Sequence, residues 1–221
     1  MRNHEEQSWQ ARKSETTRNR IMEAAINCFV TLGYTNTTIT NIADEATLSR
    51  GAMMHHFESR LDVIKSAISY LVDKRLQEFE THLESISDPD NRDVVNSESL
   101  KATVNSLWDY FRLPSFYAFQ ELLITSRTDA ELGDIVNAAQ QRLDLGVSDA
   151  IGNYFPIWSD KKSALTLIND LFHFALQGMA MSDMLKQDEE RTINLLNLLI
   201  ENGISQFKQA EILGRFPDQN H

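Results

Sequence analysis

The chain has little of what secreted, disulfide-bonded or membrane proteins require. Its 221 residues include one cysteine, which excludes an intramolecular disulfide. Cys28 lies on an apolar stripe, so a buried core residue is favoured over a redox sensor. No apolar run approaches the ~20 residues of a membrane span, and the polar stretch from Met1 to Trp9 does not resemble a signal peptide. We therefore expect a cytoplasmic protein that does not bind a membrane.

Sequence signatures of enzymes are also scarce. There is no Gly-rich phosphate loop and no nucleophile elbow. His55 and His56 are adjacent and point in different directions on a helix, so they do not form a metal pair at i and i+4. The other histidines are scattered: His4, His82, His173 and His221. We predict no catalytic residue, no metal site and no cofactor, and an enzyme is the less favoured function.

Acidic residues outnumber basic ones, but unevenly along the chain. The formal net charge is −11. Residues 1–75 hold ten Lys/Arg and nine Asp/Glu, a net charge of +1, whereas residues 76–221 hold eleven and twenty-three, a net charge of −12. A polyanion would repel the second part, so any contact with DNA is expected in the first.

The chain does contain two short amphipathic segments between Thr37 and Phe57. Ser49 is suited to cap the second segment, and Thr37 or Thr38 the first. Met53 and Phe57 would face inward, which leaves small and basic residues on the outer face of the second segment, as entry into a DNA major groove requires. Four residues give the first segment its apolar face by their i, i+3, i+4, i+7 spacing: Ile39, Ile42, Ala43 and Ala46.

Helices are also predicted on both sides of this pair. Apolar residues keep helical spacing from Ile21 to Leu32, and Gly33 suits a left-handed C-terminal cap. Downstream, Ser59 begins a helix that continues to about Leu83. The local architecture is a three-helix unit that leads into a longer fourth helix.

The segment from about Arg18 to Ala67 resembles the DNA-binding domain of the TetR/AcrR family of transcriptional regulators. The resemblance implies a helix-turn-helix regulator, most often a repressor, that binds an inverted-repeat operator in double-stranded DNA as a homodimer and responds to a small-molecule effector. The matching positions are Ile21 to Ala25, Phe29, Gly33, Tyr34, Thr37, Ile42, Ala43, Ala46, Leu48 to Gly51, His55 to Phe57 and Leu61.

Residue types in this motif assign the DNA contacts. Arg50 is the best candidate for a phosphate or guanine contact, and the small side chain of Ala52 could touch a thymine methyl. The remaining candidates are suited to contact DNA phosphates, to let the helix approach the DNA closely, or to reach the DNA backbone. They are Thr37, Thr38, Ser49, Gly51, Met54, His55 and His56.

The motif departs from the family at two positions. The family usually has glycine where this chain has Thr47, so either the turn shifts or a β-branched residue accepts a strained left-handed backbone. Met54 replaces a tyrosine that often contacts phosphate, and a thioether cannot donate that hydrogen bond.

The rest of the chain has helical patterns and no strand alternation. The predicted fold is all-α, with about nine helices: an N-terminal arm and three-helix helix-turn-helix domain in residues 1–66, a helical ligand-binding and dimerisation domain in 67–210, and a loose tail in 211–221. The later helices are expected over residues 97–113, from 114 to about 127, from there to about 155, and over 163–185 and 189–210.

The last two predicted helices each carry two apolar stripes, where a surface helix of a monomer needs one. This pattern favours a homodimer over burial inside one large core. The residues assigned to the dimer interface are Leu167, Leu171, Phe174, Gly178, Leu195 and Leu199.

Aromatic residues and methionines are concentrated between Trp108 and Met184. Core packing explains many of them, and the family resemblance raises the expectation of a pocket for a small apolar effector. The residues predicted to bind the ligand are Trp108, Tyr110, Phe111, Tyr117, Gln120, His173, Gln177 and Met181. A regulator without a small ligand, controlled by a protein partner, is the alternative.

Overall fold

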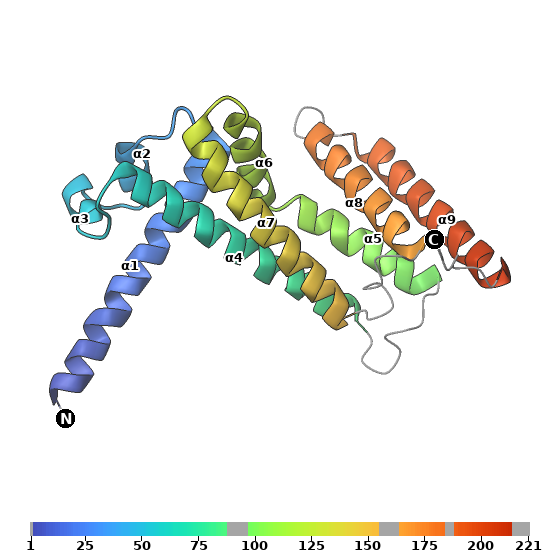
Figure 1. Cartoon of the computed structure of the whole chain (residues 1–221), viewed down its shortest axis with the longest axis horizontal. Coiled ribbons are helices and arrows are strands. Elements are labelled where there is room, and N and C mark those ends of the chain that lie inside the picture. Colours follow the sequence, from blue (N-terminus) through green and yellow to red (C-terminus); the bar gives the residue numbers. More distant parts are fainter. Residues whose placement is uncertain (1, 88–96, 155–163, 184–187, 214–221) are drawn as a thin grey trace, which may run out of the picture. The chain divides into compact units, whose positions relative to one another are not determined.

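A computed structural model describes residues 2–87, 97–154, 164–183 and 188–213 (Figure 1). Helices make up these ranges and no strand occurs in them, which confirms the predicted all-α class. The nine helices of the described residues are α1 (Arg2–Leu32), α2 (Ile39–Glu45), α3 (Arg50–Met54), α4 (Arg60–Ile86), α5 (Ser97–Phe111), α6 (Pro114–Ser126), α7 (Ala130–Tyr154), α8 (Ala164–Asp183) and α9 (Glu189–Leu213). The predicted tail, residues 211–221, lies for the most part outside the described residues.

The first helix is longer than its apolar pattern indicates. The sequence predicts helical spacing from Ile21, whereas α1 begins at Arg2. Residues 12–20 are almost all exposed, so this part of α1 buries almost no apolar surface and leaves no apolar stripe in the sequence.

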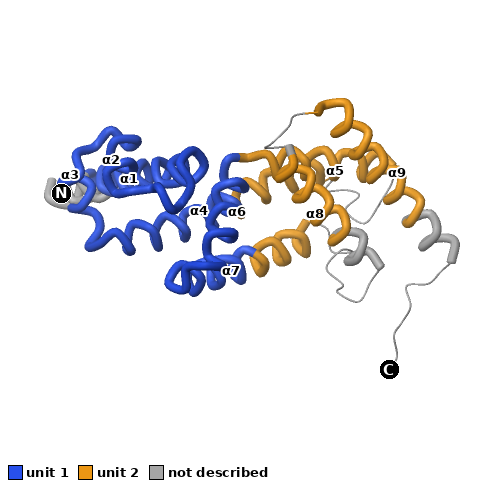
Figure 2. Tube along the Cα trace, turned by 90° about the horizontal axis from the view of Figure 1, so that it is seen from above, with its two compact units in different colours: residues 1–75, 114–143 blue, residues 76–113, 144–221 orange. Residues whose placement is uncertain are grey.

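The described chain divides into two compact units, coloured in Figure 2. Unit 1 comprises residues 1–75 and 114–143, and therefore adds α6 and most of α7 to the first helices. Unit 2 comprises residues 76–113 and 144–221, which include α5, α8 and α9. These are units of packing, so the predicted functional boundary near residue 67 stays a prediction.

Unit 1 is built around one face of α1, which packs against α2 and α6. Ile21, Ala25 and Phe29 on this face are at most 1% exposed. Arg75 of α4 is 4% exposed, and its guanidinium lies 5.1 Å from the ring centroid of Phe119 in α6, a cation–π contact. At the surface of unit 1, Arg142 of α7 forms an ion pair with Asp73 of α4.

Unit 2 has an aromatic core in which α5 packs against α8 and α9. Tyr110 lies edge-on to Phe79 and Phe111, with ring centroids 5.3 and 5.2 Å apart. On the far side Phe111 meets the ring of His173 at 5.1 Å. Edge-to-face pairs of this kind hold the rings in fixed relative orientations.

The turn between α2 and α3 has a left-handed residue at Thr47, with φ 51°. The backbone N–H of Thr47 donates to the Asp44 carbonyl and that of Leu48 to the Ala43 carbonyl, both at 2.9 Å. These two bonds form a Schellman motif, whose left-handed position is usually glycine. The sequence left open whether the turn shifts or Thr47 adopts a strained left-handed backbone. The structure shows the second: the turn is not shifted, and Thr47 has the left-handed conformation.

The other left-handed residue of the described chain is Gly33, with φ 75°, directly after α1. Glu121 of α6 reaches this turn, where its Oε1 accepts the backbone N–H of Tyr34 at 2.9 Å. A Cβ at position 33 would lie 2.9 Å from the same oxygen. The left-handed backbone therefore favours glycine here, and a Cβ would in addition require the Glu121 carboxylate to shift.

None of the described helices combines the length and the apolar character needed to cross a membrane.

Thr47→Gly is expected to stabilise the protein by about 0.5–1 kcal/mol, because the relief of left-handed strain exceeds the added chain entropy of glycine. Gly33→Ala is the matched opposite change and should lower stability. Thermal unfolding followed by circular dichroism measures both. A lower melting temperature for Thr47→Gly would show that the Thr47 side chain stabilises the turn in another way.

Candidate DNA-binding surface

Two caps define the short helices of the motif. Thr38 and Asn41 form a capping box at α2, in which the Asn41 N–H donates to the Thr38 hydroxyl at 3.2 Å and the Thr38 N–H to Asn41 Oδ1 at 3.0 Å. At α3, Ser49 Oγ accepts the N–H of Ala52 at 3.1 Å. Both caps satisfy amide groups that a helix start leaves without partners.

The core fixes which face of α3 points outward. Met53 is fully buried and Phe57 is 4% exposed, as the sequence predicts. Arg50, Gly51 and His55 are exposed. The other assigned residues of this segment lie around them, with Ser49 exposed and Ala52, Met54 and His56 half-buried.

Thr37 does not fit the role that the sequence suggested. It is 1% exposed, and its hydroxyl donates to the Gly33 carbonyl at 2.7 Å. Its backbone carbonyl accepts a hydrogen bond from the guanidinium of Arg60 at 3.4 Å. Thr37 therefore holds the turn between α1 and α2, and we leave it out of the DNA-contacting set. Thr38, its neighbour, is exposed.

Sequence reasoning missed Arg18 as a support for α3. The Arg18 guanidinium donates to the His56 carbonyl at 3.2 Å and to Ser66 Oγ of α4 at 2.7 Å. It also lies 4.5 Å from the ring centroid of Phe57. These contacts join α1, the end of the recognition segment and α4. An exposed arginine on a helix carries no sequence signal for such a role.

A second polar link connects α1 with α4. Glu23 accepts hydrogen bonds from the Tyr70 hydroxyl and from Lys74 Nζ, each at 2.7 Å. The side chains of Glu23 and Lys74 are both partly buried, which reduces the screening of the Glu23–Lys74 ion pair by water. Together with Arg18, Glu23 fixes the direction in which α4 leaves the motif.

Cys28 has the core position that its apolar stripe indicated. It is 3% exposed. Burial raises the pKa of the Cys28 thiol, and the nearby Glu45 carboxylate raises the pKa further. Such a thiol is less reactive than an exposed one, as expected for a structural residue. The described residues also contain no group of three His, Cys, Asp or Glu side chains placed to hold a metal ion.

The residues predicted to bind the ligand fall into both compact units. Tyr117 and Gln120 belong to unit 1, and the others to unit 2. Trp108, Tyr110 and Phe111 are buried in the aromatic core. At its edge, the half-buried His173 and Gln177 make a contact of 2.6 Å between their Nε2 atoms, and Met181 is half-buried as well.

The residues assigned to the dimer interface form an apolar face on α8 and α9. Leu171 is 51% exposed and Phe174 is 68% exposed. Gly178 is exposed, and a Cβ there would meet no atom within 4 Å. Leu195 and Leu199 are half-buried, whereas the side chain of Leu167 lies outside the described residues.

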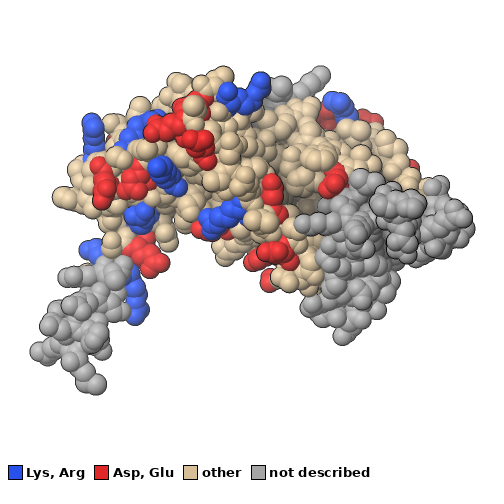
Figure 3. All heavy atoms as spheres, in the orientation of Figure 1, with Lys and Arg blue, Asp and Glu red and all other residues tan. Residues whose placement is uncertain are grey.

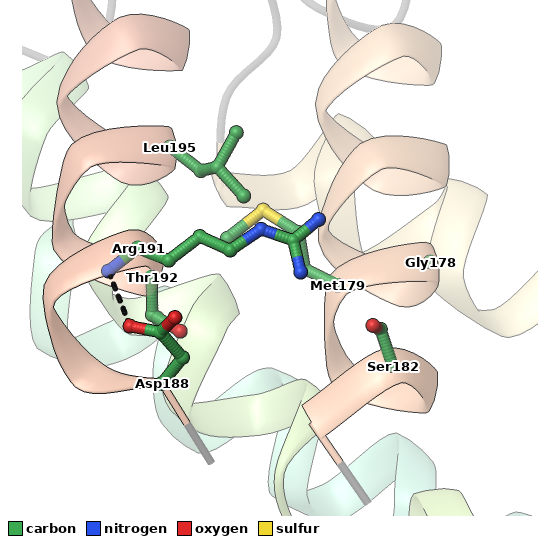
Figure 4. A pocket seen from close by; sticks show the side chains of 7 residues that line it. All are labelled: Gly178, Met179, Ser182, Asp188, Arg191, Thr192 and Leu195. Atoms are coloured by element: carbon green, nitrogen blue, oxygen red, sulfur yellow. Dashed lines mark hydrogen bonds between the residues drawn. The ribbon is translucent and has the colours of Figure 1, made fainter. Parts of the chain in front are cut away.

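A hollow opens between α8 and α9 on this face (Figure 4). Gly178 and Leu195 line it, so it coincides with part of the assigned dimer interface. Arg191 extends from α9 towards Met179 of α8 across the hollow. The residues predicted to bind the ligand are not among those that line it.

Comparisons with known proteins agree with this geometry. Bacterial regulatory proteins of the tetR family match residues 21–67, from the buried face of α1 into α4. The HTH-type transcriptional regulator SrpR of Pseudomonas putida is 31% identical over 134 residues, which are 61% of this chain and 57% of SrpR. The chain thus spans a little over half the length of that relative.

A second relative is matched over most of its length. It is TtgW of Pseudomonas putida, named as an uncharacterized HTH-type transcriptional regulator, with 31% identity over 61% of this chain and 91% of TtgW. Among solved structures, a TetR family transcription regulator from Marinobacter aquaeolei has the same fold, with a TM-score of 0.60 at 13% identity over 86% of this chain and 97% of that one. The capped α2–α3 pair, its buried core and these relatives together show that the chain belongs to the TetR family, whose members are DNA-binding transcriptional regulators and not enzymes.

Proposed function

We propose that this protein is a homodimeric repressor that binds an inverted-repeat operator and is released from it by a small, largely apolar ligand. The observation that carries the proposal is the exposed face of α3, where Arg50, Gly51 and His55 surround the half-buried Ala52. Small side chains allow the helix to lie close to the bases, and the guanidinium supplies a bidentate donor for guanine or phosphate.

The flanking groups suit the phosphate backbone. Thr38 and Ser49 are exposed at the starts of α2 and α3, and the Ser49 hydroxyl is able to donate to a phosphate oxygen. The Thr38 hydroxyl donates to Asn41 Oδ1 and would have to exchange this bond for one to phosphate. His55 and His56 follow α3 directly and would reach the backbone of the same half-site. Arg18 would act indirectly, since it holds the His56 carbonyl and the Phe57 ring in place.

Dimerisation is supported by the apolar face of α8 and α9. Phe174 and Leu198 are more than 60% exposed, which is unusual for large apolar side chains on neighbouring helices. A second copy of the chain would cover this face through a two-fold axis. Two copies of α3 would then meet successive major grooves about 34–36 Å apart, or a multiple of this spacing.

The ligand part of the proposal is based on the aromatic core of unit 2. Tyr110, Phe111 and His173 form a continuous row of rings, and Gln177 adds an amide at its edge. Apolar burial would supply most of the affinity for a ligand, and the polar pair His173–Gln177 would orient it. Release of the operator requires that the ligand favour the dimer conformation that binds DNA less well.

The burial of Tyr110 and Phe111 favours a second candidate, a TetR-family regulator without a small ligand that a protein partner controls. Both side chains are at most 2% exposed, so a ligand has to displace packed rings in order to enter.

Arg50→Ala should weaken binding of the operator by about 1–3 kcal/mol. We expect no loss of the fold, because the Arg50 side chain is exposed at the start of α3. The control is Arg127→Ala, which removes an equally exposed arginine at the turn after α6. Fluorescence anisotropy at fixed salt, with an operator selected from random duplexes, measures both. Equal affinities of Arg50→Ala and wild type would remove Arg50 from the surface that binds DNA.

Gly178→Arg should give a folded monomer that no longer binds the operator. A Cβ at this position would meet no atom of the single chain within 4 Å, so we expect the new side chain to be accommodated by the monomer and to obstruct a partner. Asn197→Arg is the control, because Asn197 is exposed on α9 and lies outside the apolar face. Light scattering reports the mass of each variant. If wild type is itself a monomer at micromolar concentration, the dimer assignment is wrong.

A thermal-shift screen of hydrophobic metabolites and drugs separates the two candidates. A ligand present at a hundred times its Kd stabilises the folded state by about 2.7 kcal/mol, and the proposal predicts that such a compound also weakens operator binding. A broad library that gives no shift would support the regulator without a small ligand.

A further inference from the structure

The N-terminal part of α1 lies ahead of the matched family domain, which begins at residue 21. In Figure 1 this part runs out past α2 and α3, and none of the other described helices lies beside it. Lys and Arg side chains lie on its described stretch in Figure 3, with acidic side chains beside them. Neither the core of unit 1 nor the recognition surface described above accounts for a helical extension of this length.

One face of this extension combines donors and positive charge. Trp9, Lys13, Thr16 and Arg20 follow the spacing i, i+4, i+7, i+11 and therefore share one side of the helix. All four are exposed. Trp9 is 62% exposed, and Lys13 Nζ lies 5.1 Å from its ring centroid. At about 100° per residue this side is opposite the buried face of Ile21 and Ala25. We call these four residues the basic stripe.

The charge of the extension is opposite to that of most of the chain. Residues 2–20 hold five basic and three acidic residues, and the stretch from Trp9 to Arg20 holds four and one, in a protein of net charge −11. An excess of this kind on an otherwise acidic protein favours a polyanionic partner over an apolar one. The ammonium of Lys13, the guanidinium of Arg20 and the indole N–H of Trp9 are all donors that phosphate oxygens accept.

The extension is also continuous with the recognition surface. It is the same helix whose Arg18 donates to the His56 carbonyl beside α3, so a rigid rod connects the basic stripe with the motif. From Trp9 to the start of the family domain at Ile21 this rod is about 18 Å long, the length of about five base-pair steps.

We propose that the basic stripe is a second DNA contact, which binds the sugar–phosphate backbone outside each half-site and does not read its sequence. The proposal rests on the function assigned to α3, because a duplex bound there would lie near the part of α1 that projects past α2 and α3. It adds a region of flanking DNA, up to about five base pairs beyond each half-site, that contributes affinity through charge alone.

The test uses the full-length protein and two duplexes, one that ends at the outer edges of the half-sites and one extended by about eight base pairs of scrambled sequence on each side. Anisotropy titrations over a range of salt concentrations compare wild type with Lys13→Ala/Arg20→Ala. The matched control is Lys101→Ala/Arg127→Ala, which removes the same two charges at exposed positions of α5 and of the turn after α6. Circular dichroism verifies that each variant is folded.

Wild type should bind the extended duplex on the order of tenfold more tightly at low salt. Lys13→Ala/Arg20→Ala should lose this gain, keep its affinity for the short duplex, and reduce the salt slope on the extended duplex by about 0.9 for each lost phosphate contact. The control pair should retain the gain. Equal binding of both duplexes by wild type, or a gain that persists in Lys13→Ala/Arg20→Ala, overturns the proposal. A wrong assignment of α3 gives a different result: Arg50→Ala would then bind the short duplex as tightly as wild type does.

Discussion

Burial of one face of α1 is the interaction on which the recognition motif depends. Helix α2 has seven residues and α3 has five, whereas an isolated helix in water needs about 12–15 residues to be even marginally stable. Their own hydrogen bonds do not hold them in place. The motif is held by Ile42, Ala43 and Met53, which are buried in the unit built on Ile21, Ala25 and Phe29. Burial of each large apolar side chain there contributes about 1.5–3 kcal/mol to the stability of the fold.

Polar contacts then set the direction of this motif. Arg18 and Glu23, both on α1, reach α4 at Ser66 and Lys74, and Glu121 of α6 reaches the turn after α1. Apolar burial is not directional, whereas these hydrogen bonds specify one arrangement of α1, α4 and α6. The outward face of α3 is thus a consequence of packing on its inner side. A change at Arg18 would alter DNA binding even if its side chain never touched DNA.

Periodicity was enough to predict the elements that bury an apolar face. The apolar stripe of α2, the cap at Ser49 and the inward Met53 and Phe57 agree with the structure, because amphipathic helices and caps leave short-range signals. The length of α1 was missed because residues 12–20 bury almost nothing. Its residue type suggests a phosphate contact for Thr37. The hydroxyl points inward because it donates to the Gly33 carbonyl in the turn after α1, which residue type does not reveal. Contacts such as Arg18 with His56 join residues 38 positions apart, which no local pattern reveals.

The most direct test of the central claim, that two copies of α3 read DNA as a symmetric pair, is selection of bound sequences from a random duplex pool by the full-length protein. The account predicts enrichment of an inverted repeat, with half-site centres about 10–10.5 base pairs or a multiple of this distance apart. Enrichment of a single asymmetric site, or no enrichment above the starting pool, would contradict it.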